Sequence, residues 1–411
     1  MSTQVIEWGE SVLLDLVAIT SGQVDPRTAP YRDLPLIAPD HLEAGTGRLI
    51  KKVSADAQGA ISGKYRVKPG DVIYSKIRPY LQKACKCDFE ALCSADMYPL
   101  TPRRGTDSSF ILHTILGRDF TNFAGSVSAR SGIPKINREE LAEYRLKVPS
   151  EGEQRAIGQT LDDADALIAI LERLISKKQA IKQGMMQQLL TGRTRLPGFT
   201  EAWSEIRLGN HVSYVNTVAL SRAQLDTKSP LKYLHYGDIH TRSSVLLDAV
   251  AEEMPRASAF LAAHAGQLRR GDLIFADASE DPAGVGKSVE IVDVPGGGVV
   301  PGLHTIAARF DQSVLADGFK AYLQFIPLFR EQLLRLAAGT KVLATTRSYI
   351  SSVILALPNV TEQKAIADVL HDSEREIDAL RVRLSKARDM KTGMMQQLLT
   401  GRTRLQVEAV S

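Results

Sequence analysis

One segment of the chain has the residue types of a phosphate-binding loop. Residues 281–288 read Asp-Pro-Ala-Gly-Val-Gly-Lys-Ser, and in such loops glycines before a Lys-Ser pair let backbone N–H groups surround a phosphate. The pattern requires glycine where Asp281 stands, and a carboxylate at that position repels phosphate. It also requires a helix after Lys287-Ser288, whereas the following residues alternate between apolar and polar as a strand does. The segment is therefore predicted not to bind a nucleotide.

Other sequence patterns of catalytic sites are either better explained by helix capping or missing from the chain. Glu362-Gln363-Lys364 imitates the Glu-x-Lys of a nuclease, but it stands at the expected start of a helix, where capping explains it better. The sequence contains no Gly-x-Gly-x-x-Gly, Gly-x-Ser-x-Gly or His-Glu-x-x-His, and no Asn/Asp-Pro-Pro-aromatic signature of an amino-group methyltransferase. The eight histidines are scattered. We therefore expect a binding protein with no catalytic residue of its own.

The three cysteines lie close together in the sequence, at Cys85, Cys87 and Cys93. A tetrahedral zinc site needs a fourth ligand, so the sequence predicts structural thiols and no metal. An odd number of thiols fits a reducing cytoplasm. No apolar run approaches the length of a membrane span, and the N-terminus has no basic, then apolar, secretory pattern, so we expect a cytoplasmic protein that does not contact a membrane.

Clusters of cationic, hydroxyl and aromatic side chains are the best candidates for contacts to double-stranded DNA, because Arg and Lys pair with guanine edges or phosphates and Ser and Thr can bind either. In the first part of the chain the candidates are Lys76, Arg78, Tyr80, Arg130, Ser131 and Lys135. In the second part they are Tyr236, Lys341, Thr345, Thr346 and Arg347. Arg138 stands at the position equivalent to Arg347, so a shared structural or phosphate-positioning role remains open for both. The net charge of only +4 requires any such surface to be local.

An internal repeat relates the two parts of the chain that contain these candidates. Residues 184–196 recur letter for letter as 393–405, at an offset of 393 − 184 = 209. The same offset relates Glu153-Gln154 to Glu362-Gln363, and a smaller offset relates Trp8 to Trp203. Because the matching residues keep their order, the whole chain reads as a duplication, and a period near 200 residues indicates two domains rather than a solenoid.

Each copy of the repeat contains a long helix. Ser150-x-x-Glu153 and Asn359-x-x-Glu362 are typical of capping boxes, in which both side chains satisfy N–H groups at a helix start. Apolar residues then follow with alternating spacings of four and three, which predicts a coiled-coil seam. The predicted seam residues are Ile157, Leu161, Ile168, Leu171, Ile175, Ile366, Leu370, Ile377, Leu380 and Leu384.

These patterns predict the domain organisation. Two mixed α/β (α+β) globular domains are expected at residues 1–150 and 200–359, with strands at 71–75 and 288–294. Helical regions are expected at 151–199 and 360–411, pairing as an antiparallel coiled coil with internal pseudo-two-fold symmetry. The alternative is that each helix packs only on its own domain.

The layout resembles the specificity subunit of type I restriction–modification enzymes. The resemblance rests on a tryptophan near the start of each half, on residues 130–136 and 148–154 in the first half, and on residues 339–341, 357–358 and 362–363 in the second. It covers nearly the whole chain, although the domain interiors match only loosely.

The resemblance implies a non-catalytic subunit in which each domain reads one half of a split DNA target. It further implies that the helices fix the gap between the halves and dock two methyltransferase subunits, which carry S-adenosylmethionine and modify adenine. Restriction subunits that use ATP and Mg²⁺ can join such a complex. Two other readings are a coiled-coil scaffold for a methyltransferase without its own DNA sequence preference, and an enzyme with an unrecognised site in one half; duplication argues against the latter.

Overall fold

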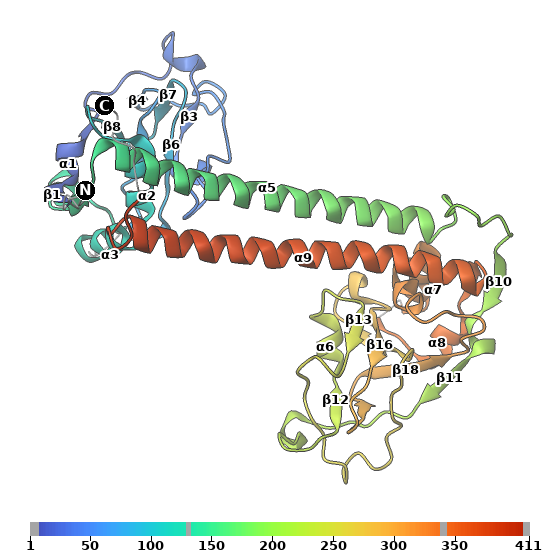
Figure 1. Ribbon diagram of the computed structural model, residues 1–411. Helices are drawn as coiled ribbons and strands as arrows, with labels where there is room; N and C mark the ends of the chain where they lie inside the picture. The colour runs from blue at the N-terminus through green and yellow to red at the C-terminus, as the bar shows by residue number, and fades with distance from the viewer. Residues whose placement is uncertain (1–7, 129–132, 338–342, 406–411) are drawn as a thin grey trace. The chain divides into compact units, whose positions relative to one another are not determined.

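The computed structural model describes residues 8–128, 133–337 and 343–405. The chain divides into two compact units, one made of Met1–Leu174 with Leu380–Ser411 and the other of Ile175–Ala379. Two 39-residue helices, α5 (Glu151–Leu189) and α9 (Val360–Leu398), each contribute one end to each unit (Figure 1). Each unit therefore combines one globular domain with two helix segments. No helix of the described residues is long and apolar enough to cross a membrane.

The first unit is a mixed α/β domain. Its antiparallel sheet has the order β2-β8-β5-β6, a smaller mixed sheet has the order β3-β7-β4, and β1 pairs with β9. The strands are β1 (Gly9–Val12), β2 (Val17–Ile19), β3 (Leu36–Ile37), β4 (Tyr65–Val67), β5 (Val72–Ser75), β6 (Ala84–Lys86), β7 (Ala91–Cys93), β8 (Met97–Pro102) and β9 (Arg145–Val148). The short helices are α1 (Leu13–Leu16), α2 (Ser108–Leu116), α3 (Arg118–Val127) and α4 (Arg138–Ala142).

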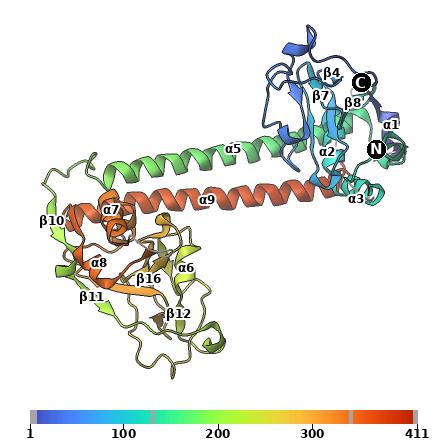
Figure 2. The same cartoon turned by 180° about the vertical axis from the view of Figure 1, so that it is seen from behind.

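The domain of the second unit repeats this plan. A five-stranded sheet has the order β11-β18-β14-β16-β13, and there are three separate two-stranded sheets, β10-β20, β12-β17 and β15-β19. Figure 2 labels β11, β12 and β16 of this domain. The strands are β10 (Ser204–Arg207), β11 (Val212–Val215), β12 (Lys232–Leu234), β13 (Leu246–Asp248), β14 (Leu273–Ala276), β15 (Ala278–Ser279), β16 (Ser288–Asp293), β17 (Val299–Pro301), β18 (Thr305–Phe310), β19 (Leu343–Ala344) and β20 (Ile354–Leu357). The helices are α6 (Tyr236–His240), α7 (Pro327–Leu336) and α8 (Arg347–Ser352).

The central strands show the duplication in detail. β5 and β14 begin 201 residues apart, and each is hydrogen-bonded to a strand on both sides. The turn before each strand is the same, because Asp71 accepts from the N–H of Lys68 and Asp272 from the N–H of Arg269, both at 2.8 Å. The strands predicted at 71–75 and 288–294 are thus confirmed as β5 and β16.

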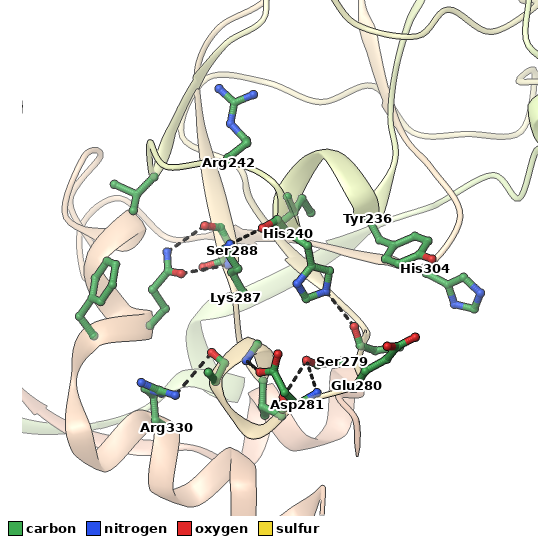
Figure 3. Close-up of a pocket in the computed structure, with 18 of the residues that line it drawn as sticks. Tyr236, His240, Arg242, Ser279, Glu280, Asp281, Lys287, Ser288, His304 and Arg330 are labelled. Atoms are coloured by element: carbon green, nitrogen blue, oxygen red, sulfur yellow. Dashed lines mark hydrogen bonds between the residues drawn. The ribbon is translucent and has the colours of Figure 1, made fainter. Parts of the chain in front are cut away.

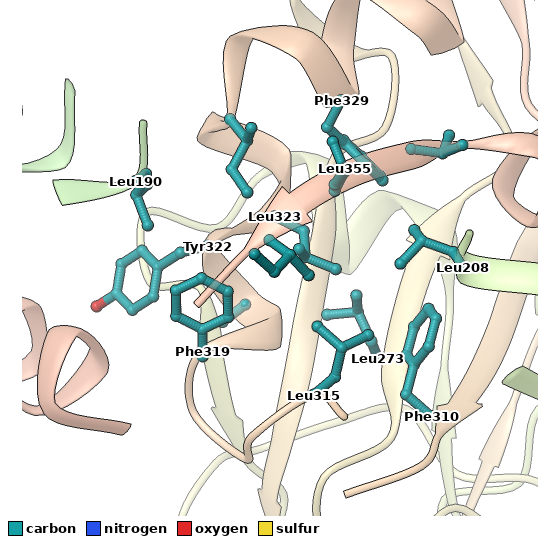
Figure 4. Packing of buried hydrophobic residues seen from close by; sticks show 14 of the residues in the cluster. Leu190, Leu208, Leu273, Phe310, Leu315, Phe319, Tyr322, Leu323, Phe329 and Leu355 are labelled. Carbon is teal, nitrogen blue, oxygen red and sulfur yellow. The ribbon is translucent and has the colours of Figure 1, made fainter. Parts of the chain in front are cut away.

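Each domain has one main hydrophobic core that also takes in the ends of the long helices. In the first unit, Phe110 and Phe120 pack with Ile157 near the start of α5 and Leu398 at the end of α9. In the second unit the cluster shown in Figure 4 surrounds Phe319, Leu323 and Phe329 and includes Leu190, just after α5 ends. Since residues 184–196 and 393–405 are identical, each domain rests on a helix end of the same sequence.

The long helices also contact each other, in antiparallel fashion, within each unit. In the first unit, Asp165 pairs with Lys391 (2.5 Å) and Glu172 with Arg388 (2.7 Å). In the second, Lys178 pairs with Glu376 (2.7 Å) and Lys182 with Glu374. As one residue number rises its partner's falls, which is the antiparallel relation predicted from the seam.

The predicted seam is buried, apart from its last residue. Ile168, Leu171, Ile175, Ile377 and Leu380 are each no more than 9% exposed, whereas Leu384 is only half-buried. The residues nearest the helix starts belong to the domain cores instead: Ile157 and Leu161 in the first unit, Ile366 and Leu370 in the second. Each helix therefore packs both on its own domain and on the other helix.

The helix starts correct one prediction. Ser150 Oγ and Asn359 Oδ1 accept hydrogen bonds from the N–H groups of Glu153 (3.4 Å) and Glu362 (2.9 Å), as a capping residue does. The two glutamates, however, do not complete capping boxes. Glu153 instead binds Arg404 at 2.5 Å and accepts from Trp8 Nε1 at 3.0 Å, and Glu362 binds Arg195 at 2.5 Å. The capping-box prediction was wrong for these carboxylates because distant cationic partners satisfy them.

These contacts form the same cluster in both units. Arg404 lies over the ring of Trp8, with 5.3 Å from its guanidinium carbon to the ring centroid, and Arg195 lies over Trp203 at 5.7 Å. We call the sets Trp8–Glu153–Arg404 and Trp203–Glu362–Arg195 the two tryptophan clusters. Both join a domain's first strand, the start of one long helix and the segment that follows the other. They explain why the repeat extends past the helix end to Arg195 and Arg404.

The glutamine beside each glutamate fixes the domain to its helix. Gln154 accepts from the N–H of Asp107 (3.1 Å) and donates to the carbonyl of Pro149 (3.0 Å). Gln363 accepts from the N–H of Ala316 (2.9 Å) and donates to the carbonyl of Pro358 (2.9 Å). The side chains of Gln154 and Gln363 are both buried, so the repeated glutamine attaches a long helix to the domain in each unit.

Asp162 of α5 is a further link between the long helix and the domain in the first unit. Asp162 accepts hydrogen bonds from Ser109 Oγ (2.5 Å), His113 Nε2 (2.9 Å) and Lys86 Nζ (3.1 Å). Burial by itself would raise the pKa of Asp162, but the hydrogen bonds from His113, Ser109 and Lys86 hold it well below its ordinary value.

We expect Asp162→Asn to lower the free energy of unfolding of the first unit by about 2 kcal/mol at pH 7, since hydrogen bonds to a charged group are lost. A depressed pKa in the folded state stabilises the protein above the carboxyl's unfolded pKa, and this contribution disappears as the pH falls through the folded value. Urea unfolding at pH 7 and near pH 3 should therefore show a smaller acid-induced loss in the variant than in the parent. Asp163→Asn, on the exposed neighbour, is the control; equal effects of the two substitutions would contradict the assignment.

Candidate functional site

The structure brings together four of the six candidate residues of the first domain. The N–H of Arg78 donates to the carbonyl of Pro134 at 2.7 Å, and the N–H of Ile136 donates to the carbonyl of Lys76 at 2.9 Å. Lys76, Arg78 and Lys135 therefore lie on two adjacent chain segments, which we call the paired loops of the first domain. Tyr80 follows in the same loop and is 60% exposed. Arg130 and Ser131 lie outside the described residues.

The backbone of these paired loops is strained. Arg78 and Gln82 have φ angles of 48° and 49°, in the left-handed region that non-glycine residues rarely adopt. Such a conformation costs on the order of 1–3 kcal/mol and persists where the surroundings impose it. The hydrogen bond to Pro134 holds the backbone of Arg78 in place, while the side chain of Arg78 is exposed.

The second domain has the same paired loops with different side chains. β15 pairs antiparallel with β19, and the N–H of Thr345 donates to the carbonyl of Asp277 at 2.7 Å. Asp277 therefore stands where the first domain has Lys76, and Ala344 where it has Lys135. An equivalent backbone thus carries cations in one domain and a carboxylate in the other. Lys341 lies outside the described residues.

The remaining candidates of the second domain have structural contacts. Thr345 is only 5% exposed, and Thr346 Oγ1 caps α8 by accepting from the N–H of Tyr349 at 3.2 Å. Tyr236 lies on α6 and lines a cavity of the second domain together with His240 and Lys287 (Figure 3). A DNA contact by any of these residues stays a prediction.

Arg347 and Arg138 have the same surroundings in the two domains. The Arg347 guanidinium lies 5.4 Å from the ring centroid of Tyr214 and donates to the carbonyl of Val215 at 3.4 Å. That of Arg138 lies 5.7 Å from the ring of Tyr98 and donates to the carbonyl of Thr20 at 3.2 Å. These contacts favour the shared structural role for both arginines.

The strand predicted after the phosphate-loop imitation is confirmed. Ser288 begins β16 rather than a helix, and Asp281 Oδ1 accepts from the N–H of Gly284 at 2.8 Å. Lys287 Nζ donates to the carbonyl of His240 at 2.5 Å. The lysine is therefore engaged by the domain's own backbone.

The three cysteines are buried, which raises the pKa of the Cys85 thiol to about 12. Within residues 8–128, 133–337 and 343–405, no group of three or more His, Cys, Asp or Glu side chains is arranged to hold a metal ion. These thiols serve packing in the first domain.

Sequence reasoning missed the tryptophan clusters and the cavity-lining residues of the second domain. A signal for the clusters was present, because the exact repeat continues beyond the helix through Arg195 and Arg404. No signal marked His240, Lys287 or Arg330 as neighbours, since they come from separate elements that only the sheet brings together.

Comparison with known proteins agrees with this architecture. The family model described as the type I restriction modification DNA specificity domain matches residues 6–181. The specificity subunit of the type I restriction enzyme EcoDI from Escherichia coli is 32% identical over 154 residues, which are 38% of this chain and only 34% of that protein's length. The MjaVIII specificity subunit of Methanocaldococcus jannaschii is 22% identical over 301 residues, covering 69% of this chain and 68% of that protein.

Two solved structures share the fold over nearly the full length. The HsdS subunit from Thermoanaerobacter tengcongensis has a TM-score of 0.52 at 18% identity, over 97% of this chain and 98% of that one. The S subunit of a type I restriction-modification system from M. genitalium has a TM-score of 0.60 at 11% identity, over 97% and 98%. At such identities these similarities concern the fold. Together with the family model, they show that residues 6–181 match the type I restriction modification DNA specificity domain and that the chain has the fold of these solved subunits.

Proposed function

We propose that this chain is the sequence-specific DNA-binding subunit of a type I restriction–modification complex, in which each domain reads one half of a split target. One observation carries the proposal: the two domains hold the same paired loops in the same way but place different polar side chains on them. Lys76, Arg78 and Lys135 are donors only, which suits the O6 and N7 acceptors of guanine. Asp277 in the second domain is an acceptor. Two domains that bind different half-sites need the same backbone arrangement with different side chains on it.

The long helices set the distance between the two readers in this proposal. α5 is one unbroken helix from Glu151 to Leu189, and α9 matches it from Val360 to Leu398. At about 1.5 Å per residue a helix of this length fixes a separation better than a flexible linker does. The same helices dock two methyltransferase subunits.

The chemistry of the complex belongs to its other subunits. We assign no catalytic residue or cofactor to this chain. S-adenosylmethionine is used by the methyltransferase subunits to modify adenine, and ATP and Mg²⁺ by restriction subunits where these are present. This chain determines the DNA sequence at which those reactions occur.

A genome-wide map of methylated adenines, made in cells with and without this chain while the methyltransferase partner is present, tests the proposal. We expect one split motif to lose its methylation on deletion, which would also give both half-sites. An unchanged map, with the partner shown to be active, would favour a methyltransferase scaffold that has no DNA sequence preference.

Replacing Arg78 with alanine is expected to weaken DNA binding of the complex by about 1–3 kcal/mol if its guanidinium contacts a base. The loss should be confined to duplexes with an intact first half-site and should relax specificity at one position there. Binding titrations with either half-site scrambled measure this. Arg104→Ala, on an exposed arginine outside the paired loops, is the control. A loss that is equal for all sequences would instead assign Arg78 to a phosphate.

A further inference from the structure

At one pair of equivalent positions beside the paired loops, the two domains hold a carboxylate and a nitrogen-bearing side chain in opposite order. The N–H of Lys76 donates to the carbonyl of Asp96 at 3.0 Å, and the N–H of Asp277 donates to the carbonyl of His304 at 3.1 Å. The backbone contact is therefore the same in both domains. The side chains on it have changed places, because the carboxylate comes second in the first domain and first in the second domain.

In the second domain these two side chains bind each other. Nδ1 of His304 lies 3.1 Å from Oδ1 of Asp277. Since a carboxylate oxygen only accepts hydrogen bonds, Nδ1 carries the proton of this contact. In a neutral imidazole the other nitrogen, Nε2, is then a hydrogen-bond acceptor. Asp277 therefore determines which nitrogen of His304 can accept a hydrogen bond from a partner.

The Nε2 atom of His304 is free to meet such a partner. Within residues 8–128, 133–337 and 343–405 it has no hydrogen-bond partner, and the side chain of His304 is 50% exposed. The ring is held on a second side, because it meets the ring of Tyr236 edge to face, with 5.3 Å between the ring centroids (Figure 3). Asp277 and Tyr236 therefore restrain an exposed ring and leave one of its nitrogens unoccupied.

The backbone at His304 is strained. Its φ angle is 57°, and the other non-glycine residues with a positive φ angle, among those that the structure describes, are Arg78 and Gln82 in the paired loops of the first domain. Such conformations persist where the surroundings impose them, and they cluster at functional sites. Glycine adopts this conformation without strain, so local backbone geometry does not favour a histidine at position 304. Its presence there indicates a role for the side chain.

An acceptor on the second domain suits a different base from the donors on the first. In the major groove, guanine presents the acceptors O6 and N7, whereas adenine and cytosine present the amino groups N6 and N4 as donors. Lys76, Arg78 and Lys135 of the first domain can only donate, which suits guanine. Nε2 of His304 can accept from the amino group of adenine or cytosine. A guanine or thymine in the same place presents an acceptor instead, and no hydrogen bond forms.

We propose that His304 is a specificity-determining residue of the second domain, and that its Nε2 accepts a hydrogen bond from the major-groove amino group of an adenine or cytosine in the second half-site. Asp277 is a positioning residue, which acts on the DNA through His304. The proposal rests on the DNA-reading function proposed above. It adds to that function the chemical class of base that the second domain selects.

Base analogues that lack the amino group test the proposal in the complex of the full chain with its methyltransferase partner. Once the second half-site is known from the methylation map, purine replaces each adenine in turn and 2-pyrimidinone replaces each cytosine. Every base pair has one such amino group in its major groove, so the scan covers the whole half-site. We expect the substitution His304→Gly to weaken binding of the unmodified target about tenfold, as loss of one base contact does.

The combination of the substitution with each analogue decides the outcome. At one position the analogue should weaken binding by the parent about tenfold and cause no further loss in His304→Gly, because both changes remove the same hydrogen bond. Losses that multiply at every position would overturn the role of His304 and leave DNA reading by the domains intact. Absence of sequence-specific binding by the parent would be seen first, and would overturn the proposed function together with this proposal.

Thermal unfolding separates loss of DNA binding from loss of folding. Glycine takes up the positive φ angle of His304 without strain, and the exposed ion pair with Asp277 contributes little to stability, so the unfolding temperature of His304→Gly should not fall. His264→Ala, on an exposed histidine of the same domain, is the matched control and should change neither the affinity nor the effect of any analogue. A lower unfolding temperature with unchanged affinity would make His304 structural and overturn the proposal.

The substitution Asp277→Asn tests the positioning role. An amide can either accept from Nδ1 or donate to it, so the imidazole of His304 can then present Nε2 as an acceptor or as a donor. We expect discrimination against guanine or thymine, at the position that the analogues identify, to fall about tenfold, while affinity for the natural target changes less. Discrimination equal to that of the parent would overturn the tautomer selection by Asp277 and the proposal with it.

Discussion

Replacing Arg195 with alanine is expected to lower the free energy of unfolding of the second unit by about 3 kcal/mol. The substitution leaves the carboxylate of Glu362, a residue only 1% exposed, without its ion-pair partner, and an uncompensated buried charge is costly. Trp203 Nε1 gives no relief, because it is buried without a hydrogen-bond partner. The loss should therefore be among the largest of any single substitution at a charged residue.

The equivalent substitution in the first unit provides the matched comparison. Arg404→Ala leaves Glu153 with the hydrogen bond from Trp8 Nε1, so we expect a smaller loss, about 2 kcal/mol. The chain has two tryptophans, one in each cluster, so urea unfolding followed by tryptophan fluorescence in Trp8→Phe and Trp203→Phe backgrounds reports each unit separately. Arg193→Ala, on an exposed arginine of the same repeat, is the control. A larger loss for Arg404→Ala than for Arg195→Ala would contradict this account of the clusters.

Lengthening both long helices by seven residues at positions 209 apart is expected to change the DNA target. Seven residues keep the seam in register and add about 10 Å to each helix. Since base pairs are stacked about 3.4 Å apart, the gap between the half-sites should grow by roughly three base pairs while both half-sites stay the same. The methylation map of cells carrying the variant measures the new gap directly.

A four-residue insertion in one helix alone is the control for this experiment. It breaks the match between the seams, so we expect loss of methylation rather than a new gap. If the seven-residue variant methylates the original target with its original gap, the helices do not set the spacing, although DNA reading by the domains would stand.

Local patterns were enough to predict much of this fold. The seam from Ile157 onward, the helix starts at Ser150 and Asn359 and the strand at 288–294 all depend on periodicity or on neighbouring residues, which a sequence shows directly. The role of Glu153 could not be read in this way, because its partner Arg404 is 251 residues away. Capping was the nearest local explanation, and the long-range ion pair replaces it.

The candidate site was predictable only in part. Lys76 and Lys135 were chosen by residue type. Their proximity depends on a single backbone bridge between Ile77 and Lys135, which no sequence pattern predicts. Thr345 and Arg347 were also chosen by residue type, but Thr345 is buried and Arg347 lies over the ring of Tyr214.

The discontinuous first unit has a consequence for synthesis. The second unit is one unbroken stretch, Ile175–Ala379, whereas the first needs segments from both ends of the chain. Leu398 is buried in the core of the first domain, so that core stays incomplete until the last repeat has left the ribosome. Translation therefore favours completion of the C-terminal domain before the N-terminal one, the reverse of the usual order. A transcript cut short before its final repeat would yield a chain whose second domain can be complete while its first, although translated in full, is not.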